Sequence, residues 1–191
     1  MSTYFTSDSH FYHRNVLNFE DRPFDSVEEM NNKLVESWNR SVNNRDIVHH
    51  LGDFCFGGYD NWKTILDQLK GRIILYKGNH DDSKTLKKIA KDGYFEDVHS
   101  VGNYIKMHGY QLWLTHYPME IGIRPNKFSI HGHLHSQPSN MLNQINVGVD
   151  SLIFKHKKFG ELITQDELVE NMEIRNPFVE NLFQEQRKGW K

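Results

Sequence analysis

The sequence has almost no cysteine, almost no alanine and no long hydrophobic run. Among its 191 residues, Cys55 is the single cysteine and Ala90 is the single alanine. One cysteine excludes an intrachain disulfide and fits a reducing compartment. No segment approaches the roughly 18 consecutive apolar residues of a membrane-spanning helix, and the start lacks a basic region followed by an apolar stretch. We therefore expect a cytoplasmic protein with no membrane partner.

Neither sign of charge dominates the chain, but one residue type is abundant. There are 23 Lys and Arg against 25 Asp and Glu, for a net charge of −2. This balance disfavours a long nucleic-acid-binding surface, although it permits a local basic patch. The chain has 12 histidines. Metal binding and acid–base chemistry are therefore the first functions to consider.

The length predicts a single domain, residues 1–191. In the first half, short β-prone or apolar runs alternate with helical patterns, which predicts parallel strands joined by helical crossovers. Capping residues Ser26 and Asp60 are expected to open two of these helices. The predicted strands are 4–7, 46–51 and 72–76, and the predicted helices are 26–41, 60–69 and 83–91.

The second half has fewer helical patterns. A hairpin is predicted over 104–114, turning at His108 and Gly109, and strands are predicted at 128–130 and 145–149. A capping box that starts at Thr164 predicts a C-terminal helix over about 164–172. The tail from Asn176 shows no clear pattern. These elements predict an α/β fold with two packed mixed β-sheets flanked by helices.

Asp, Asn and His side chains follow the predicted strands instead of being scattered. In open α/β sheets, ligands bind beyond the carboxyl ends of the strands, so five such strand ends predict one site. The strand ends carry Asp8 and His10; Asp53; Asn79, His80 and Asp81; His116; and His133 and His135.

Seven of these residues are candidate metal ligands, which is more than one tetrahedral zinc ion uses. Mixed carboxylate, amide and imidazole donors suit manganese, iron, zinc or nickel. If the backbone is extended at 8–10 and at 133–135, both polar side chains of each segment point to one side. Two metal ions therefore fit better than one. The seven are Asp8, His10, Asp53, Asn79, His116, His133 and His135.

The order Asp-x-His, Gly-Asp, Gly-Asn-His-Asp, lone His and Gly-His-x-His resembles the calcineurin-like metallophosphoesterases, in particular their small bacterial and phage branch. The resemblance spans about residues 3–150. It implies a first metal held by Asp8, His10 and His135, and a second held by Asn79, His116 and His133. It also implies that Asp53 bridges the two metals, and that His80 faces the substrate as general acid or phosphate contact.

Several neighbours of these motifs are candidates for supporting roles. His13 and Arg14 lie just past His10 and are predicted substrate contacts, with a solvated loop as the alternative for Arg14. Asp81 and His131 are predicted to orient ligands or His80 from behind. Cys55 is expected to be a small buried hydrophobic residue. His49 and His50 are expected on opposite faces of their strand as core histidines.

The predicted function is hydrolysis of a small phosphomonoester or phosphodiester by a hydroxide that bridges two divalent metals. Manganese is the first candidate, with iron, zinc, nickel and magnesium as alternatives. One alternative function is a nuclease acting on DNA or RNA, although the family's nucleases carry extra segments for which this chain has little room. Another is a metal-bound scaffold, although such members typically lose a ligand or the substrate-facing histidine. The substrate, the native metal and the oligomeric state stay open.

Overall fold

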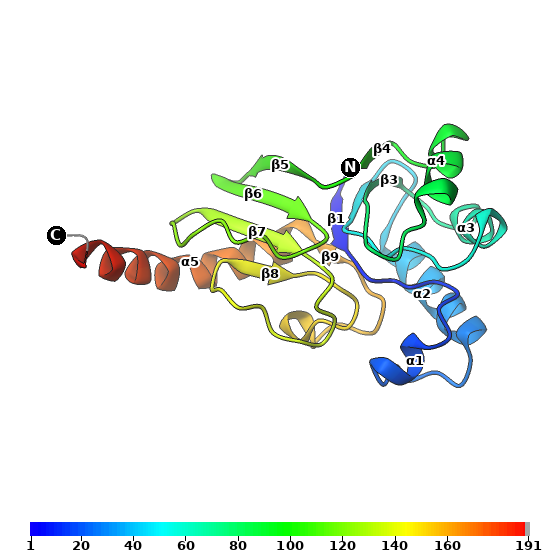
Figure 1. Ribbon diagram of the computed structural model, residues 1–191, viewed down its shortest axis with the longest axis horizontal. Helices are drawn as coiled ribbons and strands as arrows, with labels where there is room; N and C mark the ends of the chain where they lie inside the picture. Colours follow the sequence, from blue (N-terminus) through cyan, green and yellow to red (C-terminus); the bar gives the residue numbers. More distant parts are fainter. Residues whose placement is uncertain (190–191) are drawn as a thin grey trace.

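The computed structural model describes residues 1–189, and two β-sheets with flanking helices make up the fold (Figure 1). The first sheet has the strand order β4-β3-β2-β1-β9. Strands β1 to β3 run parallel, as the alternating pattern predicts. Two strands that were not predicted complete the sheet: β4 pairs parallel with β3, and β9 pairs antiparallel with β1. These strands are β1 (Thr3–Thr6), β2 (Ile47–His50), β3 (Arg72–Tyr76), β4 (Asp97–His99) and β9 (Ile163–Thr164).

The second sheet has the order β5-β6-β7-β8. Its first two strands form the predicted antiparallel hairpin, while β7 runs parallel to β6 and to β8. Both sheets are thus mixed, which confirms the predicted fold class. The strands are β5 (Gly102–Met107), β6 (Tyr110–Thr115), β7 (Lys127–His131) and β8 (Gln144–Asn146).

The helices of the first half largely begin where their capping signals predict. The hydroxyl of Ser26 accepts a hydrogen bond from the Glu29 N–H at the start of α2. Helix α4 has the predicted bounds. Helix α3 instead begins after Gly58, so Asp60 lies in its first turn and not at its cap. These helices are α1 (Val16–Phe19), α2 (Val27–Ser41), α3 (Tyr59–Leu66) and α4 (Ser83–Lys91).

The C-terminal helix α5 (Gln165–Lys188) is much longer than the predicted span of about 164–172. The capping box at Thr164 is present, but the helix continues through Pro177 to Lys188. It continues because Met172 and Val179 are buried in the same core on one helical face. In Figure 1 its distal part runs past the second sheet toward the C-terminus. Residues 190–191 of the unpatterned tail lie outside the described part of the chain.

Two hydrophobic cores lie on opposite faces of the first sheet. One contains Val48 of β2 together with Trp38 and Leu86 of the helices. The other lies between the two sheets and combines Phe5 with Ile130. Alternation along β1 sends Tyr4 to the first core and its neighbour Phe5 to the second. Within residues 1–189, none of the helices has the length and apolar character needed to cross a membrane.

The two histidines of β2 occupy opposite faces, as expected. His49 stacks on Phe5, with ring centroids 5.1 Å apart, and its Nδ1 lies 3.1 Å from the Tyr76 hydroxyl. His50 packs near Trp38 on the helical side, and its Nε2 lies 2.8 Å from the Ser9 hydroxyl. Burial lowers the pKa of His49 to about 4. His49 is therefore a neutral residue in the folded protein at pH 7.

We expect His49 to make the metal-free protein sensitive to acid. Its folded pKa lies below the unfolded value near 6.5, so the stability that neutral His49 supplies is lost as pH falls from 6.5 toward 4. At pH 4.5 this loss amounts to about 2–3 kcal/mol. Urea unfolding in the presence of a chelator measures the free energy of unfolding at pH 7 and at pH 4.5. The difference between the two pH values should be smaller by about this amount in His49→Gln than in wild type. An identical pH dependence in both proteins would contradict this assignment.

Candidate metal centre

The candidate ligands all lie on loops that follow strands, along the edge where the two sheets meet. A parallel bridge pairs Ser7, just after β1, with Gly148, just after β8. The N–H of Asp8 donates to the Gly52 carbonyl at 2.9 Å, which places the β1 loop beside the β2 loop. The structure thereby brings together all seven candidate ligands, which come from the ends of β1, β2, β3, β6 and β7.

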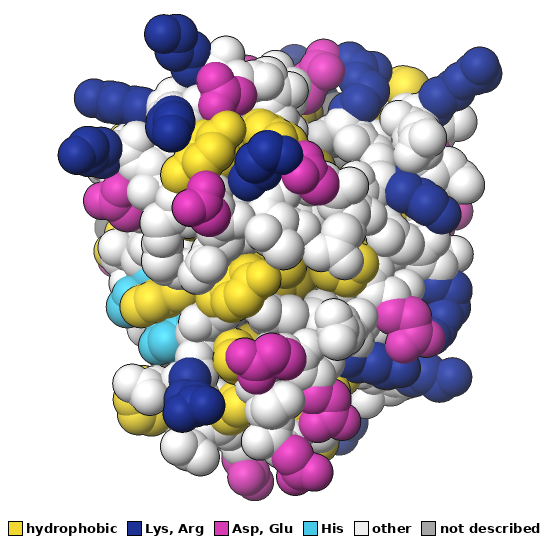
Figure 2. All heavy atoms as spheres, turned by 90° about the vertical axis from the view of Figure 1, so that its right-hand side faces the viewer, with side chains coloured by type: hydrophobic (Ala, Val, Ile, Leu, Met, Phe, Trp, Pro, Cys, Tyr) yellow, Lys and Arg dark blue, Asp and Glu magenta, His cyan; other side chains and the backbone are white. Residues whose placement is uncertain are grey.

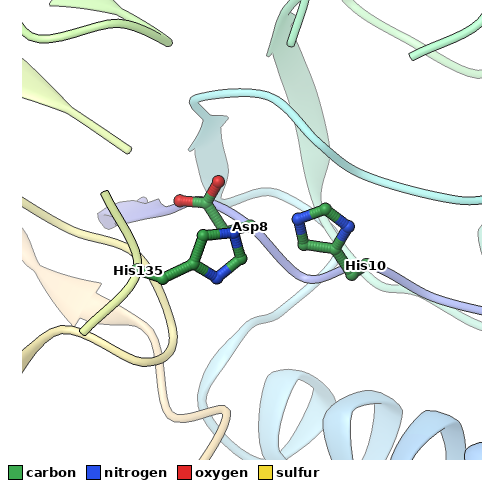
Figure 3. Close-up of side chains that lie close together, drawn as sticks. All are labelled: Asp8, His10 and His135. Atoms are coloured by element: carbon green, nitrogen blue, oxygen red, sulfur yellow. The ribbon is translucent and has the colours of Figure 1, made fainter. Parts of the chain in front are cut away.

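Asp8, His10 and His135 form a first group of donors (Figure 3). One ligand atom of each lies within 4.8 Å of the others. Within residues 1–189, the buried Nε2 of His10 has no hydrogen-bond partner. An unpaired buried imidazole nitrogen costs about 1–3 kcal/mol, so it needs an explanation. A metal ion ligated by this nitrogen supplies that explanation, and the donor set fits one.

Asn79, His116 and His133 form a second group. The Asn79 side-chain oxygen lies 2.8 Å from His116 Nε2 and 3.0 Å from His133 Nδ1. His116 Nδ1 donates to the Leu51 carbonyl at 2.8 Å, so in the neutral ring Nε2 carries a lone pair. The His116 Nε2 lone pair and the Asn79 amide oxygen thus face each other at 2.8 Å, an arrangement that a cation bound by both would explain.

Asp53 lies between the two groups. Its Oδ2 is 3.5 Å from both His10 Nε2 and His116 Nε2. Its Oδ1 accepts a hydrogen bond of 2.8 Å from the His80 backbone N–H. Asp53 also clusters with Asp8 and His116, with ligand atoms within 4.8 Å of one another. The carboxylate is thus placed to contact both groups at once.

Burial dominates the electrostatics of these residues. It raises the pKa of Asp8 to about 7, and the neighbouring charge of Asp53 adds to the increase. It lowers the pKa of His10 well below the ordinary value and also lowers that of His116. The rings of His10 and His116 are therefore neutral, the form that binds metals. At His135, burial is outweighed by the hydrogen bond to Asp150 and the nearby carboxylates, which raise the pKa of its ring. A divalent cation would stabilise the ionised form of Asp8, which burial otherwise disfavours.

The backbone is left-handed at five of the seven candidate ligands. The φ angles are 56° at Asp8, 51° at His10, 53° at Asp53, 68° at His133 and 50° at His135. The expectation of extended backbone at 8–10 and 133–135 was therefore wrong. In each segment the two left-handed residues flank one residue that is not left-handed, Ser9 or Leu134. Such strain gathers at functional sites, where the surrounding structure maintains it.

Two glycines let loops approach the carboxylates closely. A Cβ on Gly132 would collide with Ser7 Oγ and with Asp8 Oδ2, and one on Gly78 would collide with the Asp53 carboxylate. The space at Gly132 lets the next backbone N–H, that of His133, donate to Asp8 Oδ2 at 3.0 Å. Glycine at these positions is therefore a steric requirement of the site.

His80 and His13 lie beside the donors. The exposed His80 ring is centred 5.4 Å from the His10 ring and 5.9 Å from that of His13. His13 places its Nδ1 3.1 Å from His10 Nδ1 and stacks on Phe56 at 3.8 Å. Arg14 is exposed on the same loop, and its substrate contact stays a prediction.

Asp81 and His131 support the loops that carry the ligands. Buried Asp81 accepts hydrogen bonds from the backbone N–H groups of Asp53 at 3.0 Å and of Gly78 at 2.8 Å, so it joins the β2 loop to the β3 loop. His131 places its Nε2 2.9 Å from the Ser139 hydroxyl. Cys55 is buried in the first core, as expected.

Sequence reasoning missed two charged residues behind the first group. Asp150 accepts a hydrogen bond of 2.8 Å from His135 Nδ1, and Arg22 binds both oxygens of Asp150 at 2.9 and 2.7 Å. Arg22 and Asp150 are 128 positions apart, and no spacing pattern connects them. Asp150 does follow a strand, as the ligands do, and that position was its one available signal.

One family model matches nearly the whole chain, and two curated proteins are similar to it in sequence. Residues 1–182 match the family described as calcineurin-like phosphoesterase. The uncharacterized protein MJ1445 of Methanocaldococcus jannaschii is 35% identical over 136 residues, covering 70% of this chain and 69% of that protein. The Gene 66 protein of Mycobacterium phage L5 is 28% identical over 198 residues, covering 87% of this chain and 92% of that protein.

A solved structure has the same fold. The crystal structure of AQ665 from Aquifex aeolicus, titled a protein of unknown function, superposes with a TM-score of 0.69 at 26% identity. The match covers 88% of this chain and 98% of that chain. The packing of two mixed sheets with helices is thus shared with this structure.

We expect Gly132→Ala to destabilise the metal-free protein by about 1–3 kcal/mol, since its methyl group would overlap Ser7 and Asp8. Gly58→Ala is the matched control because a Cβ there meets nothing within 4 Å. Urea unfolding of both variants measures the difference. If the free energy of unfolding falls equally in the two variants, the close approach at Gly132 is not required.

Proposed function

Because the chain belongs to the calcineurin-like phosphoesterase family, whose members are metal-dependent phosphoester hydrolases, we propose that it hydrolyses a small phosphomonoester or phosphodiester at two divalent metal ions. The observation that carries this proposal is the position of Asp53 between two groups of metal-binding side chains. A carboxylate with two oxygens suits a bridge between two ions.

In this proposal, Asp8, His10 and His135 hold the first ion, and Asn79, His116 and His133 hold the second. Two such ions polarise a phosphoester and acidify water for attack on phosphorus. Mixed oxygen and nitrogen donors without thiolate favour manganese, with iron, zinc, nickel or magnesium as alternatives. Cys55 does not compete as a ligand because it is buried in the first core, where burial raises the pKa of its thiol.

His80 is the proposed general acid. Its exposed ring lies beside His10, and its backbone N–H is held by Asp53. From this position the imidazolium form would donate a proton to the leaving oxygen of the ester. His13, stacked on Phe56 next to the same ring, is proposed to line the substrate site.

Charge distribution favours a small substrate over nucleic acid. Figure 2 shows acidic and basic side chains interspersed over the face formed by the helices of the N-terminal half, with histidine at one edge beside hydrophobic side chains. A phosphate-backbone-binding surface needs clustered positive charge. The nuclease is therefore the second candidate. The scaffold alternative ranks below it because all seven donors and His80 are present.

The function is tested by stripping the protein of metal and assaying p-nitrophenyl phosphate and bis-p-nitrophenyl phosphate with manganese, nickel or zinc. We expect turnover that depends on added metal. Asp53→Ala should lose both ions and all turnover, since its carboxylate contacts both donor groups. Asp60→Ala removes an exposed carboxylate from α3 and is the matched control. Bound metal without turnover of either ester would refute the proposal.

We expect His80→Ala to bind two metal ions normally but to hydrolyse esters about 10²–10⁴-fold more slowly, the usual contribution of a general acid. Metal content and turnover should be measured on the same sample. His156→Ala, which removes another exposed histidine, is the control. Loss of a metal ion from His80→Ala would mean that His80 is a ligand and not the acid.

A further inference from the structure

We propose that Arg22 is the positioning residue that sets the geometry of the whole first donor group. The proposal rests on the proposed function, because it concerns Asp8, His10 and His135 as ligands of one metal ion. Arg22 lies between α1 and α2, and only 4% of its surface is exposed. A cation buried this deeply behind a cation-binding site needs a reason.

Every N–H of the guanidinium has an acceptor. Nε donates to Asp150 Oδ1 at 2.9 Å, and Nη2 donates to Asp150 Oδ2 at 2.7 Å. Nη2 also donates to the Asp8 carbonyl at 2.7 Å. Nη1 donates to the Ser9 carbonyl at 2.9 Å and to Met30 Sδ at 3.3 Å. These contacts use all five donors that a guanidinium offers.

The acceptors lead to each of the three ligands. The Asp8 and Ser9 carbonyls belong to the two peptide units that connect Asp8 to His10. Asp8 and His10 are the two residues of this segment with left-handed backbone. Asp150 accepts the Nδ1–H of His135, which leaves His135 Nε2 free as the ligand atom. One rigid planar group therefore fixes two backbone carbonyls and, through Asp150, one imidazole ring.

Asp150 itself is better explained as an anchor than as a further ligand. Ligand atoms of Glu20, His135 and Asp150 lie within 4.8 Å of one another, so their spacing alone would fit another metal ion. Both oxygens of Asp150, however, already accept hydrogen bonds from Arg22, and one also accepts from His135. Metal-ligating histidines commonly donate their other N–H to such a carboxylate.

Electrostatics and positioning predict opposite effects of removing the positive charge of Arg22. A buried cation repels a metal ion nearby, so repulsion alone predicts that its loss strengthens metal binding. If Arg22 acts by positioning, its loss weakens binding to the first group. Lysine keeps the charge but offers three donors from one nitrogen, and it cannot replace the planar fork. Metal affinity therefore separates the two explanations.

The test is calorimetric titration of manganese into metal-free wild type, Arg22→Lys and Arg22→Met. We expect one site of unchanged affinity and one site weakened about 10–100-fold in both variants, the usual effect of removing such a support. Arg72→Met is the matched control. Arg72 also binds a carboxylate through two of its nitrogens, that of Glu96, but it does so on the surface. Unchanged affinities, tighter binding or equal weakening of both sites would overturn the proposal.

Asp150→Asn tests the same contact from its other end. It keeps the size of the side chain, and it should weaken the same site even if the Arg22 variants fold poorly. If this variant binds manganese at both sites as tightly as wild type does, the proposal is also overturned. Ester turnover by wild type, measured in parallel, separates this result from the proposed function. If wild type binds two ions but does not turn over either ester, only the proposed function is contradicted. If wild type is active but the variants lose manganese affinity equally at both sites, only the role of Arg22 is contradicted.

Discussion

The left-handed backbone at Asp8, His10, Asp53, His133 and His135 is the constraint on which the rest of the site depends. Each such residue costs about 1–3 kcal/mol, and a folded domain is stable by only about 5–15 kcal/mol in total. Contacts around the site must therefore offset this cost. Gly132 allows a loop to press against Asp8, Asp81 joins two loops through their backbone N–H groups, and Arg22 holds two carbonyls of the β1 loop.

The fold explains why these loops meet. Helix-flanked parallel strands place the ends of β1, β2 and β3 along one edge, and the bridge from Ser7 to Gly148 attaches the second sheet at the same edge. Oxygen donors and imidazoles then face a small region that contains the unpaired His10 nitrogen and the Asp8 carboxyl with its raised pKa. A bound divalent metal ion would resolve both unfavourable features at once.

Local signals in the sequence predicted the elements that local interactions determine. Helix α4 and the hairpin at His108 have their predicted positions because an amphipathic pattern and a turn signal suffice. The full length of α5 was missed because Pro177 breaks the pattern, and burial of Val179 against distant strands compensates. The candidate ligands could be found because each follows a strand. The pairing of Arg22 with Asp150 could not, since only the folded chain brings them together.

The central claim is that two metal ions share Asp53. Anomalous diffraction from crystals of the manganese-loaded protein tests it most directly, because each ion gives a separate peak. We expect two peaks about 3.5–4 Å apart, one beside His10 and His135 and the other beside His116 and His133, with the Asp53 carboxylate between them. A single peak, or two peaks that Asp53 does not connect, would contradict it.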